Sequence, residues 1–126
     1  MKSLSVLCVF YVVLLPGCGK QLAENVDPDQ AKQALQTALE AWKSGKSNAD
    51  LGSLQPPIVM NEADWTNGGR LLDYKMNEAG SLDGRQVRWV VQIKVQDKAG
   101  KVSERKATYI IDTTPRIVIV RDNFAS

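Results

Sequence analysis

The chain has 126 residues, with 16 Lys and Arg against 14 Asp and Glu, two cysteines and no histidine. This length suits one ordinary domain and excludes a multidomain enzyme. The near balance of charge argues against a nucleic-acid partner, because phosphate binding needs clustered basic residues. The lack of histidine removes the commonest general base and the commonest metal ligand. We therefore expect no catalytic activity, no cofactor and no metal.

The first 17 residues have the pattern of an export signal. Lys2 supplies a positive start, and a nearly unbroken apolar run from Leu4 to Leu15 follows it. A helix over this run would span roughly 18 Å, well short of the ~30 Å hydrocarbon core of a bilayer. A cleaved signal peptide therefore fits this segment better than a transmembrane helix does.

The apolar run ends in Leu15-Pro16-Gly17-Cys18, which resembles the lipobox of bacterial lipoproteins. The resemblance implies that signal peptidase II cuts after Gly17 and that Cys18 carries the acyl chains, palmitate among them. It also implies a lipid-anchored protein of the cell envelope. Gly19 stands where an aspartate would retain the protein in the inner membrane, so the outer membrane is favoured in a cell that has one. An ordinary secretory leader with a chance cysteine is the alternative.

These signals divide the chain into three parts. Residues 1–17 are the expected signal peptide, 18–26 are the acylated cysteine and a tether, and 27–126 form a single domain. The tether reaches at most about 28 Å when it is fully extended. The domain is therefore expected to stay close to the membrane.

The domain is expected to open with an amphipathic helix. Asp27 can cap it, Pro28 suits the first helical position, and Lys43 and Gly45 mark its end. One apolar stripe repeats at helical spacing. It consists of Ala31, Ala34, Leu35, Ala38, Leu39 and Trp42.

The next segments are short. Residues 47–50 predict a capping box that opens a single helical turn, with Leu51 and Leu54 facing inward. Residues 58–60 predict a short extended piece, and 61–69 predict a polar turn around a tryptophan that ends at two glycines.

The second half of the chain alternates with the period of a β-strand. The predicted strands are 70–77, 86–96, 102–113 and 117–121, with turns at 80–84 and 97–100. The residues predicted to face inward are Leu72, Tyr74, Met76, Val87, Trp89, Val91, Ile93, Val95, Ala107, Tyr109 and Ile111. The fold class is therefore α+β, with an N-terminal helix packed on a curved four-stranded antiparallel meander.

Over residues 27 to about 121, this layout resembles the cystatin-like and NTF2-like rolls, in which a curved sheet wraps an N-terminal helix. The NTF2-like resemblance implies an acid inside the concavity of the sheet, a role that Asp73 or Tyr74 could take. The cystatin-like resemblance implies a Gln-x-Val-x-Gly inhibitory hairpin. The nearest match, 92–96, has no glycine and lies within a strand, so we exclude protease inhibition.

Without histidine, only Asp, Glu, Lys, Tyr or a hydroxyl group could serve catalysis, and we consider the carboxylates first. Glu62 and Asp64 flank Trp65, and Asp73 lies in the first long strand. Nothing in their spacing brings two of them together, so we interpret all three as solvated turn and edge residues.

Trp65 has two interpretations. It lies in a polar turn, where the indole can cover the core or stand exposed as a recognition residue. The core-lid interpretation is favoured, because tryptophan is seldom left fully exposed.

Basic residues gather near the tip of the hairpin that joins the second and third predicted strands. They are Lys98, Lys101, Arg105 and Lys106. They could contact anionic lipid headgroups. A charged edge that discourages aggregation is the favoured interpretation.

These observations predict a lipid-anchored extracytoplasmic binding or structural module without catalytic activity. Its expected partners are the membrane, through Cys18, and an unidentified protein of the envelope, with no nucleic acid. The alternative is an NTF2-like small-ligand domain or enzyme whose site, with Asp73 or Tyr74, lies in the concavity of the sheet.

Overall fold

The computed structural model describes residues 27–123. The expected signal peptide, Cys18 and the tether lie outside the described residues. The helical elements are α1 (Pro28–Lys43), the 3-10 helix η2 (Asn48–Ser53) and α2 (Ala63–Thr66). The strands are β1 (Ile58–Asn61), β2 (Arg70–Met76), β3 (Ser81–Asp83), β4 (Gln86–Gln96), β5 (Val102–Asp112) and β6 (Ile117–Arg121).

Helix α1 forms as its sequence predicts. The Asp27 side chain accepts hydrogen bonds from the backbone N–H groups of Asp29 and Gln30, at 3.0 and 3.3 Å. The helix ends at Lys43, and Gly45 then adopts a positive φ of 90°. Every residue of the predicted apolar stripe is buried. The capping box of Ser47 and Asp50 at the start of η2 is also present.

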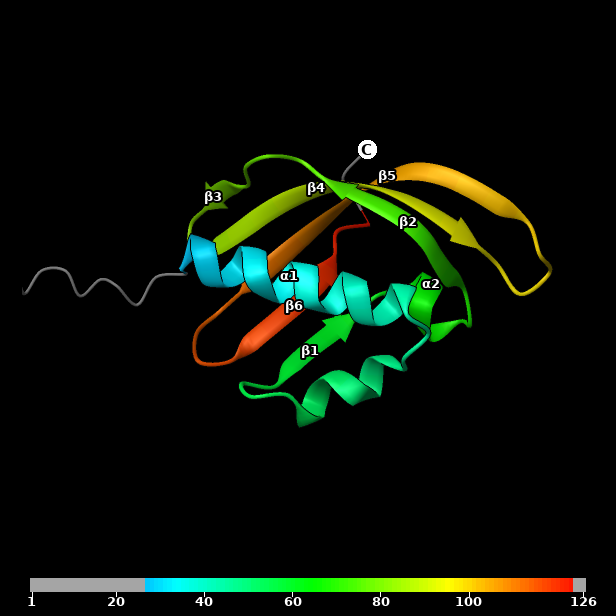
Figure 1. The fold of residues 1–126 in the computed structure, drawn as a ribbon. Helices are drawn as coiled ribbons and strands as arrows, with labels where there is room; N and C mark the ends of the chain where they lie inside the picture. The colour runs from blue at the N-terminus through cyan, green and yellow to red at the C-terminus, as the bar shows by residue number, and fades with distance from the viewer. Residues whose placement is uncertain (1–26, 124–126) are drawn as a thin grey trace, which may run out of the picture.

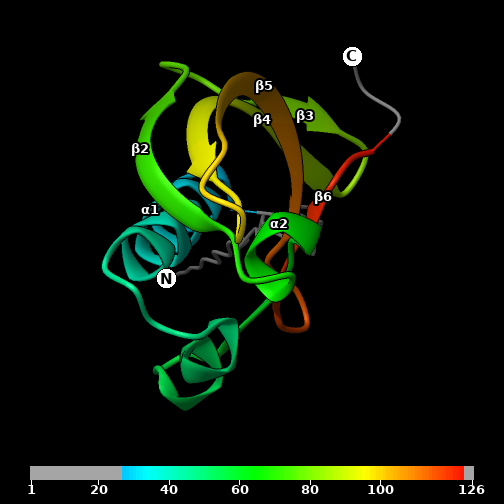
Figure 2. The ribbon, with the colours of Figure 1, turned by 90° about the vertical axis from the view of Figure 1, so that its right-hand side faces the viewer.

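The sheet curls around α1, which lies against its concave side (Figures 1 and 2). The strand order is β1-β6-β5-β4-β2, and β3 pairs with β4 beyond the end of β2. The long β4–β5 hairpin extends past the other strands at the end of the molecule opposite the start of α1 (Figure 1). The fold class is therefore α+β, and the helix packs against a curved sheet as expected.

The prediction of four antiparallel strands is wrong, because the sheet has six strands and is mixed. β1 pairs in parallel with β6, so the segment expected only to be extended forms one edge of the sheet. β3 lies within the predicted turn 80–84 and pairs with β4. A parallel pair between the first and last strands is a long-range contact, and short alternating runs do not reveal it.

Two predictions of inward side chains are also wrong. The register of β2 against β4 shifts between Leu71 and Asp73, so Leu71 takes the buried position and Leu72 is only half-buried. Tyr74 and Met76 nevertheless pack against the core as predicted. Leu54 follows the end of η2 and is 36% exposed, so only Leu51 of that pair faces inward.

The inward face of β4 and β5 is as predicted from the alternation of the sequence, and all eight of its predicted residues are buried. Together with α1 they form a single apolar cluster. Because this cluster is the core, the stability of the domain depends on the packing of α1 against the curved sheet.

Between Asp27 and Asn123, no helix is long and apolar enough to cross a membrane.

We predict that Leu39→Ala lowers the free energy of unfolding by about 2–5 kcal/mol, because Leu39 is fully buried under α1 and its truncation leaves a cavity. Chemical denaturation measures this loss. The control is Gln36→Ala on the exposed face of the same helix, expected within about 0.5 kcal/mol of the wild type. A loss below about 1 kcal/mol for Leu39→Ala would contradict the packing of α1 on the sheet.

Candidate functional site: a buried ion-pair network and the α1–η2 groove

The concave side of the sheet is filled by side chains of the core. Leu35 and Leu39 of α1 have no exposed surface, and Tyr109 and Ile111 of β5 face them with none either. None of the larger hollows in the described part of the chain is lined by Tyr109 or Ile111. The site that the NTF2-like resemblance implied inside the concavity is therefore occupied by the protein itself.

A carboxylate is buried at one end of this core. Glu62 lies between β1 and α2, and its side chain is 0% exposed. One of its oxygens accepts a hydrogen bond of 2.6 Å from the Tyr109 hydroxyl, and the other accepts one of 2.8 Å from the backbone N–H of Asp64. Arg121 Nη1 lies 2.9 and 3.0 Å from the two carboxylate oxygens. Both oxygens of the Glu62 carboxylate therefore accept hydrogen bonds, and the Arg121 guanidinium balances its charge.

The network continues to the surface through Asp64. Its Oδ2 accepts from Arg121 Nη1 at 3.1 Å and from Arg105 Nη2 at 2.6 Å. Arg121 is 17% exposed, whereas Arg105 is 42% exposed. Two carboxylates and two guanidinium groups therefore tie α2 to β5 and β6, with the buried end at Glu62 and the solvated end at Arg105.

The interpretation of Glu62 as a solvated turn residue is wrong, and Glu62 and Asp64 do converge, on Arg121. The parallel register explains why. Ile58 pairs with Ile117 and Met60 with Ile119, so the next inward position of each strand is Glu62 and Arg121. The sequence carried this signal in the alternation of both segments. It becomes readable only once β1 and β6 are known to be neighbours.

Two members of the network, Tyr109 and Arg121, have pKa values raised by their surroundings. Burial and the neighbouring Glu62 carboxylate raise the pKa of Tyr109 far above its ordinary value. Burial lowers the pKa of Arg121, but the charges and hydrogen bonds of Glu62 and Asp64 more than offset this, and the net shift is upward. Tyr109 and Arg121 therefore keep their protons and continue to donate hydrogen bonds to Glu62.

Trp65 belongs to the core. Its ring stacks on that of Trp42, with centroids 5.6 Å apart and planes 15° from parallel. Its indole N–H donates to the Lys46 carbonyl at 2.9 Å, and the Trp42 indole donates to the Gly69 carbonyl at the same distance. Trp65 is 7% exposed, as expected of a lid on the core and not of an exposed recognition residue.

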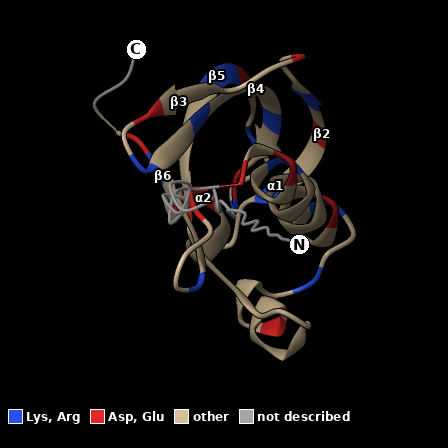
Figure 3. Cartoon of the chain, turned by 90° about the vertical axis from the view of Figure 1, so that its left-hand side faces the viewer, with Lys and Arg blue, Asp and Glu red and all other residues tan. Residues whose placement is uncertain are grey.

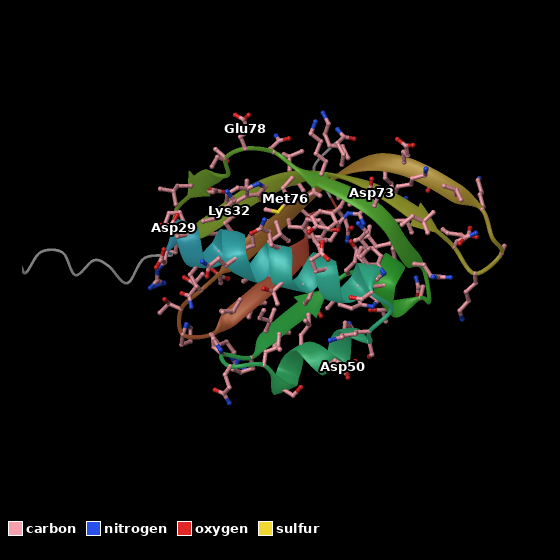
Figure 4. The ribbon with its side chains drawn as sticks, viewed as in Figure 1. Asp29, Lys32, Asp50, Asp73, Met76 and Glu78 are labelled. Atoms are coloured by element: carbon pink, nitrogen blue, oxygen red, sulfur yellow. The ribbon has the colours of Figure 1, made fainter. Side chains whose placement is uncertain are left out.

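The structure separates the other two candidates, Asp73 and Tyr74. Asp73 is largely exposed on β2 and lies 3.6 Å from Lys43 Nζ (Figure 4). Tyr74 points toward α1, where its hydroxyl donates to Glu40 at 2.6 Å. Burial and this hydrogen bond raise the pKa of Tyr74 to about 12. The two residues share only a hollow of about 250 Å³ over β2 and β4, outside the concavity.

Among the described residues, the largest of these hollows is a groove between α1 and η2, of about 850 Å³. Its walls carry Glu40, Ser44 and Tyr74 on one side and Asp50 and Ser53 on the other. A second hollow of about 270 Å³ continues from it toward Ile58 and Ile117, and Thr37 and Leu54 line both. We call the two together the α1–η2 groove.

Leu54 contributes apolar surface to both hollows of the α1–η2 groove. It was predicted to be buried, yet it lies at the junction of the two hollows, where Pro56 and Ile58 add further apolar surface. Polar side chains of α1 border the same groove. A floor with apolar patches and a few hydrogen-bonding groups is typical of a binding site.

No group of three or more His, Cys, Asp or Glu that could hold a metal ion occurs within residues 27–123. Comparisons with protein-family models, with curated proteins and with solved structures give no match for this chain.

We predict that Arg121→Met lowers the free energy of unfolding by about 3–5 kcal/mol, because it leaves the Glu62 carboxylate buried without its cation. Thermal or denaturant unfolding measures the effect. The matched control is Arg105→Met at the solvated end of the same network, with an expected loss within about 1 kcal/mol. Equal losses of unfolding free energy for the two variants would contradict a larger contribution from the buried Glu62–Arg121 pair than from the exposed Asp64–Arg105 pair.

Proposed function

We propose that this protein is a lipid-anchored module of the cell envelope that binds a partner at its surface and catalyses no reaction. The lipobox-like Leu15-Pro16-Gly17-Cys18 supports the anchor. Acyl chains on Cys18 and on its new amine would hold the protein far more firmly than a single chain does. The outer membrane is the favoured location in a cell that has one.

The point at which the chain enters the domain orients it on such an anchor. The backbone N–H of Asp27 donates to Thr113 Oγ1 at 3.1 Å, which fixes the start of α1 beside the β5–β6 turn. The β4–β5 turn lies at the opposite end (Figure 1). A tether of at most about 28 Å then favours the end near Asp29 and Lys32 as the one that faces the bilayer (Figure 4).

The single observation that carries the binding function is the α1–η2 groove, at about 850 Å³ the largest hollow among the described residues. Its carboxylates, Glu40 and Asp50, outnumber its one ammonium group, that of Lys46. The lining therefore favours a neutral or cationic ligand, such as a peptide side chain, over an anion. Viewed from the start of α1, acidic and basic residues are interspersed over the domain (Figure 3), which also argues against a nucleic-acid partner.

The absence of catalysis is supported by the use of the carboxylates. Glu62 and Asp64 converge on Arg121, and Asp83 and Asp122 converge on Arg88, so an arginine side chain holds each of these carboxylate pairs. An acid or base in catalysis must reach a substrate and exchange a proton. Glu62 has no exposed surface through which a substrate could reach it.

The rolled layout supports a relation to the cystatin-like and NTF2-like folds, with a helix held in a curved sheet (Figure 2). A small-ligand function of the NTF2-like kind would have to use the groove beside Tyr74, because Leu39 and Tyr109 occupy the concavity. This second candidate predicts a small molecule in the groove where the first predicts a protein.

We predict that a photo-crosslinking residue at Ser53, inside the groove, gives a discrete protein adduct in intact cells. The matched control carries the same residue at Lys75, an exposed position of β2 outside the groove, and should give none. Intact-protein mass spectrometry of the purified chain should show acyl chains on the fragment that contains Cys18. Cys18→Ser should remove both the acyl mass and partition into the detergent phase.

A chain that lacks the acyl mass would overturn the anchor. An acylated chain that gives equal adducts at both positions, or none at either, would overturn the binding of a protein partner in the groove. A small molecule bound at Ser53 without any protein adduct would favour the second candidate.

A further inference from the structure

One edge of the sheet is open beside β5. β6 pairs only with the last part of β5, from Tyr109 to Asp112. The final rung of that ladder is the hydrogen bond of 2.8 Å from the backbone N–H of Asp122 to the carbonyl of Thr108. The first part of β5 therefore has β4 on one side and no strand on the other (Figure 1).

The register identifies the backbone groups at this open edge. The backbone N–H of Asp97 donates to the Lys101 carbonyl, so odd-numbered residues of β5 direct their N–H and C=O groups toward β4. Val102, Glu104 and Lys106 direct theirs away from it. No backbone hydrogen bond within residues 27–123 reaches these edge-facing groups.

The side chains around this edge carry more positive than negative charge, and Glu104 is the carboxylate among them. Arg105 is bound to Asp64. Lys101 and Lys106 form no ion pair with any residue that the structure describes. Val102 is 45% exposed and offers an apolar contact at the start of the edge.

We propose that the open edge of β5 binds an extended segment of a partner protein, rich in acidic residues, which adds to the sheet as a strand. Backbone groups of Val102, Glu104 and Lys106 would supply the ladder, and Lys101 and Lys106 would attract the acidic side chains. The residue of the segment directly opposite Glu104 would be uncharged. The inference rests on the proposed surface-binding function and adds a second contact to it. The edge lies at the end of the domain away from the start of α1 (Figure 1), where a partner can approach an anchored protein.

A second copy of this chain fits the edge poorly. A two-fold register centred on Glu104 places that carboxylate opposite its own copy, and like charges facing each other are destabilising. A register centred on Arg105 places Val102 of the second copy opposite Thr108, where Asp122 already lies. The other two-fold registers avoid the contact between Glu104 side chains and the overlap with Asp122. They pair at most two edge-facing residues of each copy, which makes a short ladder. A separate acidic strand can pair with all three edge-facing residues and is therefore the better occupant.

The test uses the full acylated chain in detergent and a synthetic peptide of about seven residues, alternating valine and glutamate, which is long enough to span the edge. The peptide should slow amide exchange of Val102, Glu104 and Lys106, measured by NMR, by at least about tenfold. The amides of Ser103 and Arg105 already face β4 and should change little. A peptide with lysine in place of glutamate should bind more weakly, and added salt should weaken the acidic peptide.

Two variants of Glu104 separate the contribution of its backbone N–H from that of its side chain. Glu104→Pro removes an edge-facing N–H without removing a bond to β4, and it should weaken peptide binding roughly tenfold. Glu104→Ala keeps the N–H and should leave the affinity within about threefold. Unchanged exchange at all three amides, or equal binding by the two variants, would overturn the proposal. So would a response to anionic lipid vesicles without any response to the peptide.

The outcomes separate this inference from the proposed function. A chain that binds the peptide but carries no lipid would refute the anchor and leave the edge intact. An acylated chain that gives an adduct at Ser53 but no protection of β5 would refute the edge alone.

Discussion

The buried pair between Glu62 and Arg121 is the interaction on which one end of the roll depends. Because Glu62 also caps α2, its position fixes the short helix that carries Trp65. Trp65 in turn stacks on Trp42 near the end of α1. A lone buried carboxylate would cost several kcal/mol, so this end is stable only with its cation in place. One charge pair thereby links the first strand, the last strand and the helix that fills the sheet.

Filling the concavity has a consequence for function. A curved sheet around a helix can hold a ligand inside, but here Leu35, Leu39 and Tyr109 occupy that space without exposed surface. The two binding surfaces that we propose therefore lie outside the concavity, at the α1–η2 groove and at the free edge of β5.

Local patterns predicted the elements well and their long-range pairing poorly. The stripe of α1 and the alternation of β4 and β5 are dictated by neighbouring residues, so period and capping were sufficient to place them. The parallel β1–β6 pair joins segments at opposite ends of the domain, and no local signal encodes it. Glu62 was misread for the same reason, since its burial is explained only by Arg121 on the neighbouring strand. The prediction that Leu72 faces inward fails because alternation assumes a continuous ladder, whereas the register of β2 shifts between Leu71 and Asp73.

The ionisation of Tyr109 tests the filled concavity most directly. Burial and the Glu62 carboxylate raise its pKa, so the folded state holds the neutral phenol and loses stability as the pH rises above about 10, where the unfolded chain ionises. In a Tyr11→Phe/Tyr74→Phe variant, Tyr109 is the only tyrosine. The account predicts no phenolate absorbance at about pH 11 until the chain unfolds. Phenolate that forms near pH 10 in the folded protein would contradict a closed, filled core.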